Sequence, residues 1–546
     1  MAVEVSKPEH DTPTPAGRMN CVNPATGETY ATVPITPADA VPGIRAAVSN
    51  AQRTWAARPI KDRVAVVSAF LDGFVDRGEA VAAEISAAAG KPAYAAMDEV
   101  VLLAACGRSF AAGAPEWLAD DTSRSCALMG SRPSIVRRVP LGVVAMITPY
   151  NFPLVLALSN TLAALLAGNA VMLKVSEAVP GIGKLIEELF SELADGKLAP
   201  LVHVLYGGSE VGSAMVDAAV GKPDHVLFIG SGAVGRKVAM AAAAGGVGCT
   251  LELGGNDGAV VCADADIPAA VEAIAFGALY NSGQCCIGVE RAYVVDDVYD
   301  EFVDAMVKHV KEKVSYGYTP APGAGSGDGN TDSEHKDVTY GCAIVPSQLK
   351  AVQAQVDAAV AAGAKVLTGG QLEGKCYPPT VLTLPDGPNT EAGSGGDATT
   401  GATTGADTAT PLLEKETFGP VLPIMRVPTP EAGVAAANAT EFGLGGYIFT
   451  RDTKPGGMGD RLARQMETGG VVVNDTMLQF IHSGVPFGGR RSSGTGRTGG
   501  KEGLLEFTAC QTIITSDPAG APDWQSRFSY ADKLGALKSL YGRAQG

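Results

Sequence analysis

The stretch "HVLFIGSGAVG", from His225 to Gly235, joins an apolar run to a glycine-rich turn and then to an alanine-rich segment. A short, continuous apolar run that ends at glycine is typical of a buried strand. The segment after the glycines has the composition of a helix. A strand that passes through a tight turn into a helix is the repeating unit of parallel α/β sheets. This stretch therefore predicts an α/β protein.

The same alternation continues in both directions along the chain. Apolar runs are separated by alanine-rich helical segments, which is the order of elements that produces a doubly wound parallel sheet. Because 546 residues exceed what one hydrophobic core usually supports, we expect two such α/β domains in tandem. The expected strands are 142–147, 169–175, 202–207, 225–230 and 249–255 in the first series, and 258–263, 291–296, 364–370, 421–427 and 469–475 in the second.

Composition excludes several classes of protein. Hydrophobic residues make up 46% of the chain and charged residues 18%, which is typical of a large globular enzyme and not of a disordered protein. The net charge of -16 opposes binding to nucleic acid or to anionic membrane surfaces. The ten cysteines show no disulfide spacing and the six histidines no ligand spacing, so we expect a reducing compartment and no metal.

No segment has the pattern of a signal peptide or a membrane span. The first twenty residues contain no apolar core. The longest apolar run, Leu154 to Leu173, is interrupted by polar residues and glycine, so it predicts a buried helix followed by a strand. We expect a soluble, cytoplasmic protein. The Gly, Thr, Ser and Asp rich segments 319–337 and 386–410 predict surface insertions, with a functional lid as the alternative.

The glycines Gly230 to Gly235 fit the G-x-G-x-x-G fingerprint, in which a diphosphate binds backbone N–H groups at a helix N-terminus. By that rule Glu252, about 20 residues further on, is a candidate ribose ligand. The usual fingerprint, however, follows the first strand of its domain, and this motif lies deep within the chain. Lys174 and Glu177, at the end of an earlier expected strand, are better ribose candidates. Glu252 is then available for another role.

Seven short motifs occur along the chain in a fixed order. They are "ITPYNFPL", "KVSE", "FIGSGAVG", "LELGG", "GQCC", "ETFGPV" and "PFGGRRSSGTGR". In this order and spacing the sequence resembles the aldehyde dehydrogenase superfamily, from about Val22 to about Thr515. The resemblance implies NAD(P)-dependent oxidation of an aldehyde to the carboxylic acid, by the hydrolytic branch of the superfamily.

The resemblance also implies a division of the chain. It consists of a Rossmann-like cofactor-binding domain, a catalytic domain and a small β oligomerisation element, which together imply a homodimer or homotetramer. The corresponding ranges are 20–122 and 141–253 for the cofactor-binding domain, 254–502 for the catalytic domain, 123–140 and 503–516 for the oligomerisation element, and 517–546 for a C-terminal extension. Apolar residues at helical spacing in that extension predict a helix that packs on a neighbouring subunit or docks loosely; they are Phe528, Leu534, Leu537, Leu540 and Tyr541.

Three residues carry the chemistry that the resemblance implies. Cys286 would be the nucleophile that forms a thiohemiacetal, and Asn151, with the backbone N–H of Cys286, would bind the oxyanion. Glu252 would activate the water that hydrolyses the thioester. Singly, a buried Cys, a paired Glu and a capping Asn are all ordinary, and it is their joint occurrence that favours catalysis. Cys285 is expected to line the pocket, with a redox-protective role as the alternative.

The cofactor residues that the resemblance implies lie in five of the seven motifs and in "YGGSEVG", from Tyr206 to Gly212. They are Ile147, Thr148, Pro149, Lys174, Glu177, Gly208, Gly212, Gly230, Ser231, Gly235, Leu253, Glu416 and Phe418. A carboxylate at Glu177 accepts a hydrogen bond from a ribose 2′-hydroxyl and repels a 2′-phosphate, which favours NAD over NADP. Lys174 and Ser176 soften that discrimination, so NADP stays possible.

The substrate tunnel implied by the resemblance is mostly apolar. Its residues are Phe152, Val155, Leu156, Ser159, Cys285, Ile287, Ile481 and Phe487. Ser159 and Ile481 stand where relatives often carry an aromatic ring, so we expect a wide tunnel for medium-chain or aromatic aldehydes. The alternative substrate is a carboxylated semialdehyde such as succinate semialdehyde, bound by a cation near "PFGG". The candidate cations are Arg490, Arg491, Lys501 and protonated His482.

Two rival functions share this fold. CoA-acylating aldehyde dehydrogenases typically lack the glutamate of "ELGG", so Glu252 favours hydrolysis over acyl transfer to CoA. A non-enzymatic structural or binding protein would typically have lost part of the catalytic set, whereas Asn151, Glu252 and Cys286 are all present.

Overall fold

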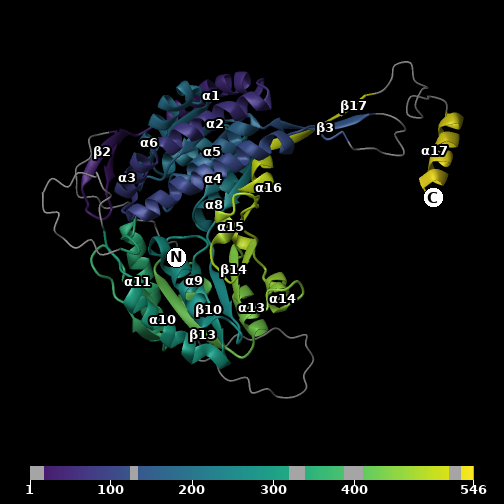
Figure 1. The fold of residues 1–546 in the computed structure, drawn as a ribbon. Coiled ribbons are helices and arrows are strands. Elements are labelled where there is room, and N and C mark those ends of the chain that lie inside the picture. Colours follow the sequence, from purple (N-terminus) through teal and green to yellow (C-terminus); the bar gives the residue numbers. More distant parts are fainter. Residues whose placement is uncertain (1–16, 123–132, 319–337, 386–409, 516–529, 545–546) are drawn as a thin grey trace.

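Two twisted sheets, each covered by helices, organise the protein (Figure 1). The structure is a computed structural model that describes residues 17–122, 133–318, 338–385, 410–515 and 530–544. The expected α/β class with two doubly wound sheets is confirmed, and each of the ten expected strands is present.

The first sheet is built around the stretch that begins at His225. Its parallel strands are β4 (Val143–Ile147), β5 (Ala170–Lys174), β6 (Val202–Leu205), β7 (His225–Ile229) and β8 (Gly248–Glu252). They lie in the order β8-β7-β4-β5-β6, so the direction of winding reverses between β4 and β7. Ligands of open α/β sheets bind at the carboxyl ends of the strands beside such a reversal. The glycine motif follows β7, the fourth strand of this sheet in chain order.

Helices cover both faces of this sheet. They are α1 (Val41–Ala56), α2 (Ile60–Asp76), α3 (Gly78–Ala89), α4 (Ala93–Trp117), α5 (Val155–Ala167), α6 (Pro180–Glu192), α7 (Ser209–Val216) and α8 (Gly232–Ala244). Every residue of α5 is buried, because it packs against α2, α4 and β5. The apolar run from Leu154 to Leu173 is thus a buried helix followed by a strand, as expected. A hairpin of β1 (Arg18–Val22) and β2 (Thr29–Pro34) precedes these elements.

The second sheet contains six parallel strands and one antiparallel edge strand, in the order β11-β12-β13-β10-β9-β14-β15. The strands are β9 (Asp257–Val261), β10 (Val289–Val295), β11 (Lys365–Thr368), β12 (Thr380–Thr383), β13 (Val421–Val427), β14 (Gly445–Phe449) and β15 (Gly470–Val473). Its helices are α9 (Ile267–Leu279), α10 (Tyr299–Lys313), α11 (Pro346–Ala361), α12 (Pro411–Glu414), α13 (Pro430–Asn438), α14 (Met458–Gln465) and α15 (Leu478–Ile481).

Sequence patterns missed the internal strand β14 because it begins with two glycines, which are depleted in strands. The packing requires both. A Cβ atom at Gly445 would collide with the carboxylate of Asp257, and one at Gly446 would lie 2.7 Å from Cε of Met466.

After the second sheet the chain returns to the first. The short strand β16 (Gly494–Thr495) pairs with the end of β8, and Gly494 lies opposite Glu252. The next helix, α16 (Gly500–Leu505), packs against α4 and α5. Residues near the end of the range 254–502 therefore pack with the first sheet. As a result, Gly494 lies next to Glu252.

A two-stranded ribbon projects from the body of the molecule (Figure 1). Its strands are β3 (Ser134–Pro140) and β17 (Thr508–Ile514), paired antiparallel along their full length. The C-terminal helix α17 (Tyr530–Ala544) lies beyond the ribbon, with Leu534, Leu537 and Tyr541 exposed. Residues 123–132, 319–337 and 386–409, Phe528 and the side chain of Leu540 lie outside what the structure describes.

The cysteines depart from the sequence-based expectation at one place. Cys342 and Cys376 form a disulfide across 34 residues of sequence, with Cα atoms 4.2 Å apart. The expectation that the cysteines stay unpaired is wrong for these two, because a spacing rule cannot detect a contact made by the folding of distant loops. In the part of the chain that the structure describes, no helix is long and apolar enough to span a bilayer.

Candidate active site

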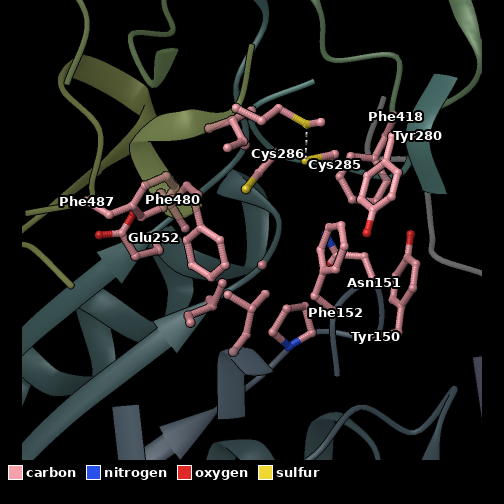
Figure 2. Close-up of a pocket in the computed structure, with 18 of the residues that line it drawn as sticks. Tyr150, Asn151, Phe152, Glu252, Tyr280, Cys285, Cys286, Phe418, Phe480 and Phe487 are labelled. Atoms are coloured by element: carbon pink, nitrogen blue, oxygen red, sulfur yellow. Dashed lines mark hydrogen bonds between the residues drawn. The ribbon is translucent and has the colours of Figure 1, made fainter. Parts of the chain in front are cut away.

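A cavity of about 520 Å³ lies where the carboxyl ends of β4, β7 and β8 face the loops of the second sheet (Figure 2). It brings together all three expected catalytic residues, Asn151, Glu252 and Cys286. Among the other expected residues its lining contains Pro149, Gly230, Ser231, Leu253, Glu416, Phe418, Phe152, Leu156, Cys285, Ile287, Ile481 and Phe487.

Cys285 and Cys286 follow a tight turn at Gly283, which packs closely against the backbone of Gly419. Gly283 has φ +69°, and a Cβ atom there would collide with the backbone of Gly419. The Cys285 side chain is buried, and its Sγ donates to Sδ of Met477 at 3.6 Å (Figure 2). The Cys286 side chain is only partly buried. A hydrogen bond with Cys285, together with burial, raises the pKa of the Cys286 thiol well above its usual range.

Asn151 lies beside this loop and is tied to it. Its Nδ2 donates to the backbone O of Gln284 at 3.0 Å, and Nδ2 of Asn281 donates to the backbone O of Asn151 at 3.0 Å. An amide nitrogen carries two N–H donors. One N–H of Asn151 is thus used in positioning, and the second is available to a ligand oxygen in the cavity.

Glu252 ends strand β8 and is 4% exposed. Among the described residues neither of its carboxylate oxygens has a hydrogen-bond partner, although buried polar groups are normally paired. Burial raises the pKa of Glu252 well above the usual range; Arg497 opposes the shift and Glu506 adds to it. A Cβ atom at Gly488 would lie 2.7 Å from Oε1, so the glycine of "PFGG" leaves room for this carboxylate.

The expected ribose residues gather at the carboxyl ends of β4 and β5. A Cβ atom at Gly212 would lie 3.6 Å from Cδ of Lys174 and 3.7 Å from Cδ1 of Ile147, which places these three in contact. Lys174 is buried, and its Nζ lies 3.1 Å from Oε2 of Glu177 in an ion pair. The side chain of Glu177 is 45% exposed. Gly208 has open space around it at the start of α7, and Thr148 is buried beside Lys174.

The motif from Gly230 to Gly235 contributes to the structure in two ways, by lining the cavity and by allowing close packing. Gly230 and Ser231 immediately precede α8 and line the cavity. Gly235 lies in the first turn of α8, where a Cβ atom would collide with Leu253. Glycine there allows α8 to approach the chain after β8, which is the role of the third glycine in dinucleotide folds. Backbone N–H groups at a helix start and the open space at Gly208 fit a nicotinamide dinucleotide.

Two buried acids, Glu416 and Glu290, lie on the side of the cofactor region that is nearer to the second sheet. Oε1 of Glu416 accepts a hydrogen bond from the Gly255 N–H at 3.1 Å, and burial raises the pKa of Glu416 well above its usual range. Glu290 accepts from the backbone N–H groups of Thr417 and Phe418 at 2.8 and 3.0 Å. Burial raises the pKa of Glu290 to about 7. Glu290, which sequence reasoning missed, therefore holds the loop that carries Glu416 and Phe418.

The substrate side differs from the expectation in two ways. Val155 and Ser159 are buried within α5 and do not line the cavity, which ends on that helix at Leu156. The missed wall residues come from α4, α9 and the segment around α15. They are Asp98, Val101, Leu102, Phe276, Tyr280, Met477 and Phe480. Motifs do not indicate them because each helix contributes one turn to the wall through packing alone.

The cavity wall contains acids and no cation. Its ionisable carboxyl groups belong to Asp98, Glu252 and Glu416, and no lysine, arginine or histidine of the described residues lines it. The expected semialdehyde-binding cations, Arg490, Arg491, Lys501 and His482, are all exposed and lie outside the wall. Arg491 instead pairs with Glu467 and donates to two backbone carbonyls. None of these four residues lines the cavity, so their role in binding a semialdehyde stays a prediction.

Known proteins resemble this chain over almost its whole length. A putative succinate-semialdehyde dehydrogenase [NADP(+)] 2 of Mycobacterium ulcerans is 32% identical over 92% of this chain and 90% of its own length. The 4,4'-diapolycopene aldehyde oxidase of a Methylomonas species is 35% identical over 74% of this chain and 69% of its own length.

Solved structures agree with this. The lactaldehyde dehydrogenase of Escherichia coli superposes with a TM-score of 0.79 at 28% identity, over 91% of this chain and 95% of that one. The NADP-dependent glyceraldehyde-3-phosphate dehydrogenase of Bacillus halodurans, complexed with NADP, gives 0.78 at 28% identity over 92% and 96%. The model of the aldehyde dehydrogenase family matches residues 12–392 and 396–513. The chain therefore belongs to the aldehyde dehydrogenase family.

Proposed function

We propose that this protein oxidises a neutral, apolar aldehyde to its carboxylic acid, with Cys286 as nucleophile, Asn151 as oxyanion donor and Glu252 as base. One observation carries the proposal. A buried carboxylate without a hydrogen-bond partner among the described residues lies in the same cavity as a cysteine and a side-chain amide that has a second N–H to donate. An unpaired buried carboxylate is costly to the fold, so its presence calls for a functional reason.

The reaction begins at Cys286, whose thiolate adds to the carbonyl carbon and forms a thiohemiacetal. The free N–H of Asn151 and the backbone N–H of Cys286 stabilise the charge on the former carbonyl oxygen. NAD(P) would supply the acceptor for the hydride that leaves the thiohemiacetal carbon, whose oxygen then re-forms a carbonyl group as a thioester. The thioester left on Cys286 is hydrolysed by a water from which Glu252 removes a proton. Burial raises the pKa of Glu252, which makes its deprotonated carboxylate a stronger proton acceptor.

The proposed cofactor is NAD in preference to NADP. The family uses nicotinamide dinucleotides, and relatives of this chain are named NADP-dependent. In this chain the exposed carboxylate of Glu177 would lie beside the adenosine ribose and repel a 2′-phosphate, although its partner Lys174 reduces that repulsion. The ratio of kcat/KM with NAD to kcat/KM with NADP tests this choice.

The proposed substrate class follows from the charge of the wall. A carboxylated aldehyde would bring a negative charge beside Asp98, Glu252 and Glu416 without a compensating cation in the wall. Relatives named succinate-semialdehyde dehydrogenase make that substrate the rival to test. Hexanal, benzaldehyde and succinate semialdehyde should be compared by kcat/KM under one set of conditions. Preference for the semialdehyde would overturn the apolar assignment.

We further propose that the protein is a cytoplasmic homodimer or homotetramer that uses the ribbon of β3 and β17. A two-stranded ribbon alone is marginally stable, and β17 exposes Ile513 and Ile514. Light scattering coupled to size-exclusion chromatography tests this. A monomeric mass at micromolar concentration would refute it.

A further inference from the structure

A fully buried ion pair lies behind the wall of the catalytic cavity. Lys91 lies in the link between α3 and α4, Glu99 lies in the second turn of α4, and the lysine Nζ is 2.6 Å from Oε1 of the glutamate. The side chains are 2% and 0% exposed, and neither residue lines the cavity. The attraction within a buried ion pair does little more than offset the loss of water around both charges. A gain in stability therefore does not account for this pair.

The second carboxylate oxygen of Glu99 holds the start of α5. Oε2 accepts hydrogen bonds from the backbone N–H groups of Leu154 at 3.0 Å and Val155 at 3.1 Å. The first N–H groups of a helix have no partner within that helix, and the apolar side chain of Leu154, at the N-cap position, cannot supply one. The helix dipole also favours a negative charge there. Glu99 thus caps a helix other than its own.

The chain between this cap and the reaction centre is short. Asn151 lies three residues before Leu154, and Pro153 between them has a fixed φ. Lys91 holds the middle of this segment, because its Nζ lies 4.3 Å from the centre of the Phe152 ring, where a cation is attracted to the aromatic face. Asn151 and Phe152 both line the catalytic cavity (Figure 2). The ion pair therefore holds the turn that presents Asn151.

Asn151 is anchored from two sides. On one side its Nδ2 donates to the backbone O of Gln284, and on the other Glu99 holds the helix that follows it. An oxyanion donor is effective only if it already points to where the charge will develop. A misplacement of about 1 Å costs on the order of 10²-fold in rate. The capping of α5 thus bears directly on the oxyanion step.

We propose that Glu99 is a positioning residue for this step. By capping α5 it fixes the turn that begins at Asn151, and with it the direction of the second N–H of the Asn151 amide. Lys91 balances the charge of Glu99 and holds Phe152. The inference rests on the proposed function, in which Asn151 stabilises the oxyanion. It adds that Glu99 acts through Asn151 without touching the substrate.

Two double variants test this, and each removes both charges so that no unpaired charge stays buried. The readout is the rate constant of hydride transfer, followed as NADH formation in the first turnover with saturating hexanal and NAD. Lys91→Met with Glu99→Leu removes the cap and should slow this step about tenfold, less than the roughly 10²- to 10³-fold for loss of an oxyanion donor. Lys91→Met with Glu99→Gln keeps an amide oxygen as acceptor and should stay within about threefold of wild type. The dissociation constant for NAD should not change in either.

The same substitutions in an Asn151→Ala background show whether Glu99 acts through Asn151. There the Leu double variant should slow hydride transfer by less than about twofold, because residues that act through one another are not additive. Should the Leu double variant not fold, Glu99→Asp, whose carboxylate is one methylene shorter, provides the same comparison. Trp55→Phe is the matched control, because it removes the hydrogen bond from Trp55 Nε1 to the backbone O of Leu165, 2.7 Å long, at the other end of α5. This control should transfer hydride at the wild-type rate.

The outcomes separate this inference from the proposed function. If Asn151→Ala transfers hydride at the wild-type rate, the proposed function itself is wrong. If Asn151→Ala is slow but removal of the cap has no effect, or has the same effect in both backgrounds, the positioning role of Glu99 is refuted. An equal loss in the Gln and Leu double variants, or in Trp55→Phe, would assign the effect to general loosening of the fold and would also overturn the proposal.

Discussion

Replacing Glu252 by glutamine distinguishes its two possible roles, that of the general base and that of a ribose ligand. Gln keeps the volume but cannot accept a proton from water. The carboxylate has no hydrogen-bond partner to lose, so the cavity should keep its shape. General bases contribute roughly 10²- to 10⁴-fold to rate, so thioester hydrolysis should slow by about that factor. Hydride transfer does not need this base and should stay fast.

Rapid mixing of Glu252→Gln with hexanal and NAD should therefore give a burst of NADH close to one per active site, followed by slow turnover. Wild-type protein should give a smaller burst because the thioester does not accumulate. If Glu252 were a ribose ligand instead, the variant would mainly raise the KM for NAD and show no burst. That result would refute its assignment as the base.

The same substitution has a pH signature in stability. Because burial raises the pKa of Glu252 in the folded state, its protonated form is favoured by folding. This contribution to stability is fully present below the unfolded-state pKa and is lost as pH rises through the folded-state pKa. Glu252→Gln should therefore melt at a higher temperature than wild type in alkaline buffer, and the difference should shrink on acidification.

Four further substitutions test neighbouring parts of the site. Cys286→Ala should abolish aldehyde oxidation while NAD binding by titration calorimetry persists, and Cys285→Ala should keep most activity; the reverse pattern would show that the register of "GQCC" is misassigned. Glu177→Ser should raise kcat/KM with NADP relative to NAD by roughly tenfold, since it removes a charge beside the ribose, and an unchanged ratio would remove Glu177 from cofactor selection. Asp98→Asn should raise kcat/KM for succinate semialdehyde relative to hexanal by roughly tenfold, which equals ~1.4 kcal/mol. This is well below the ~4 kcal/mol with which two adjacent charges interact near a protein surface. An unchanged ratio would mean that the substrate carboxylate does not approach Asp98.

Short patterns were sufficient for the parts of the molecule that are local in sequence. The apolar run at His225, its glycines and the helix after them lie where the sequence predicted, because each feature is decided within about ten residues. The order of the motifs identified the family for the same reason. The single positions that the motifs mark, Asn151, Glu252 and Cys286, meet in one cavity.

The parts that the sequence could not supply depend on contacts between distant segments. Lys91 and Glu99 form a fully buried ion pair, with Nζ and Oε1 2.6 Å apart. Oε2 of Glu99 accepts from the backbone N–H groups of Leu154 and Val155, and Lys91 lies 4.3 Å from the centre of the Phe152 ring. No pattern in α4 reveals that its acid caps α5 and so orients the segment after Asn151.

The central claim is that Cys286 becomes acylated by the aldehyde. The most direct measurement is mass spectrometry of Glu252→Gln after acid quenching of a single turnover with hexanal and NAD, followed by fragmentation of the peptide that contains both Cys285 and Cys286. The account predicts one hexanoyl group on Cys286, dependent on NAD. An unmodified peptide despite NADH formation, or acylation of Cys285 alone, would contradict it.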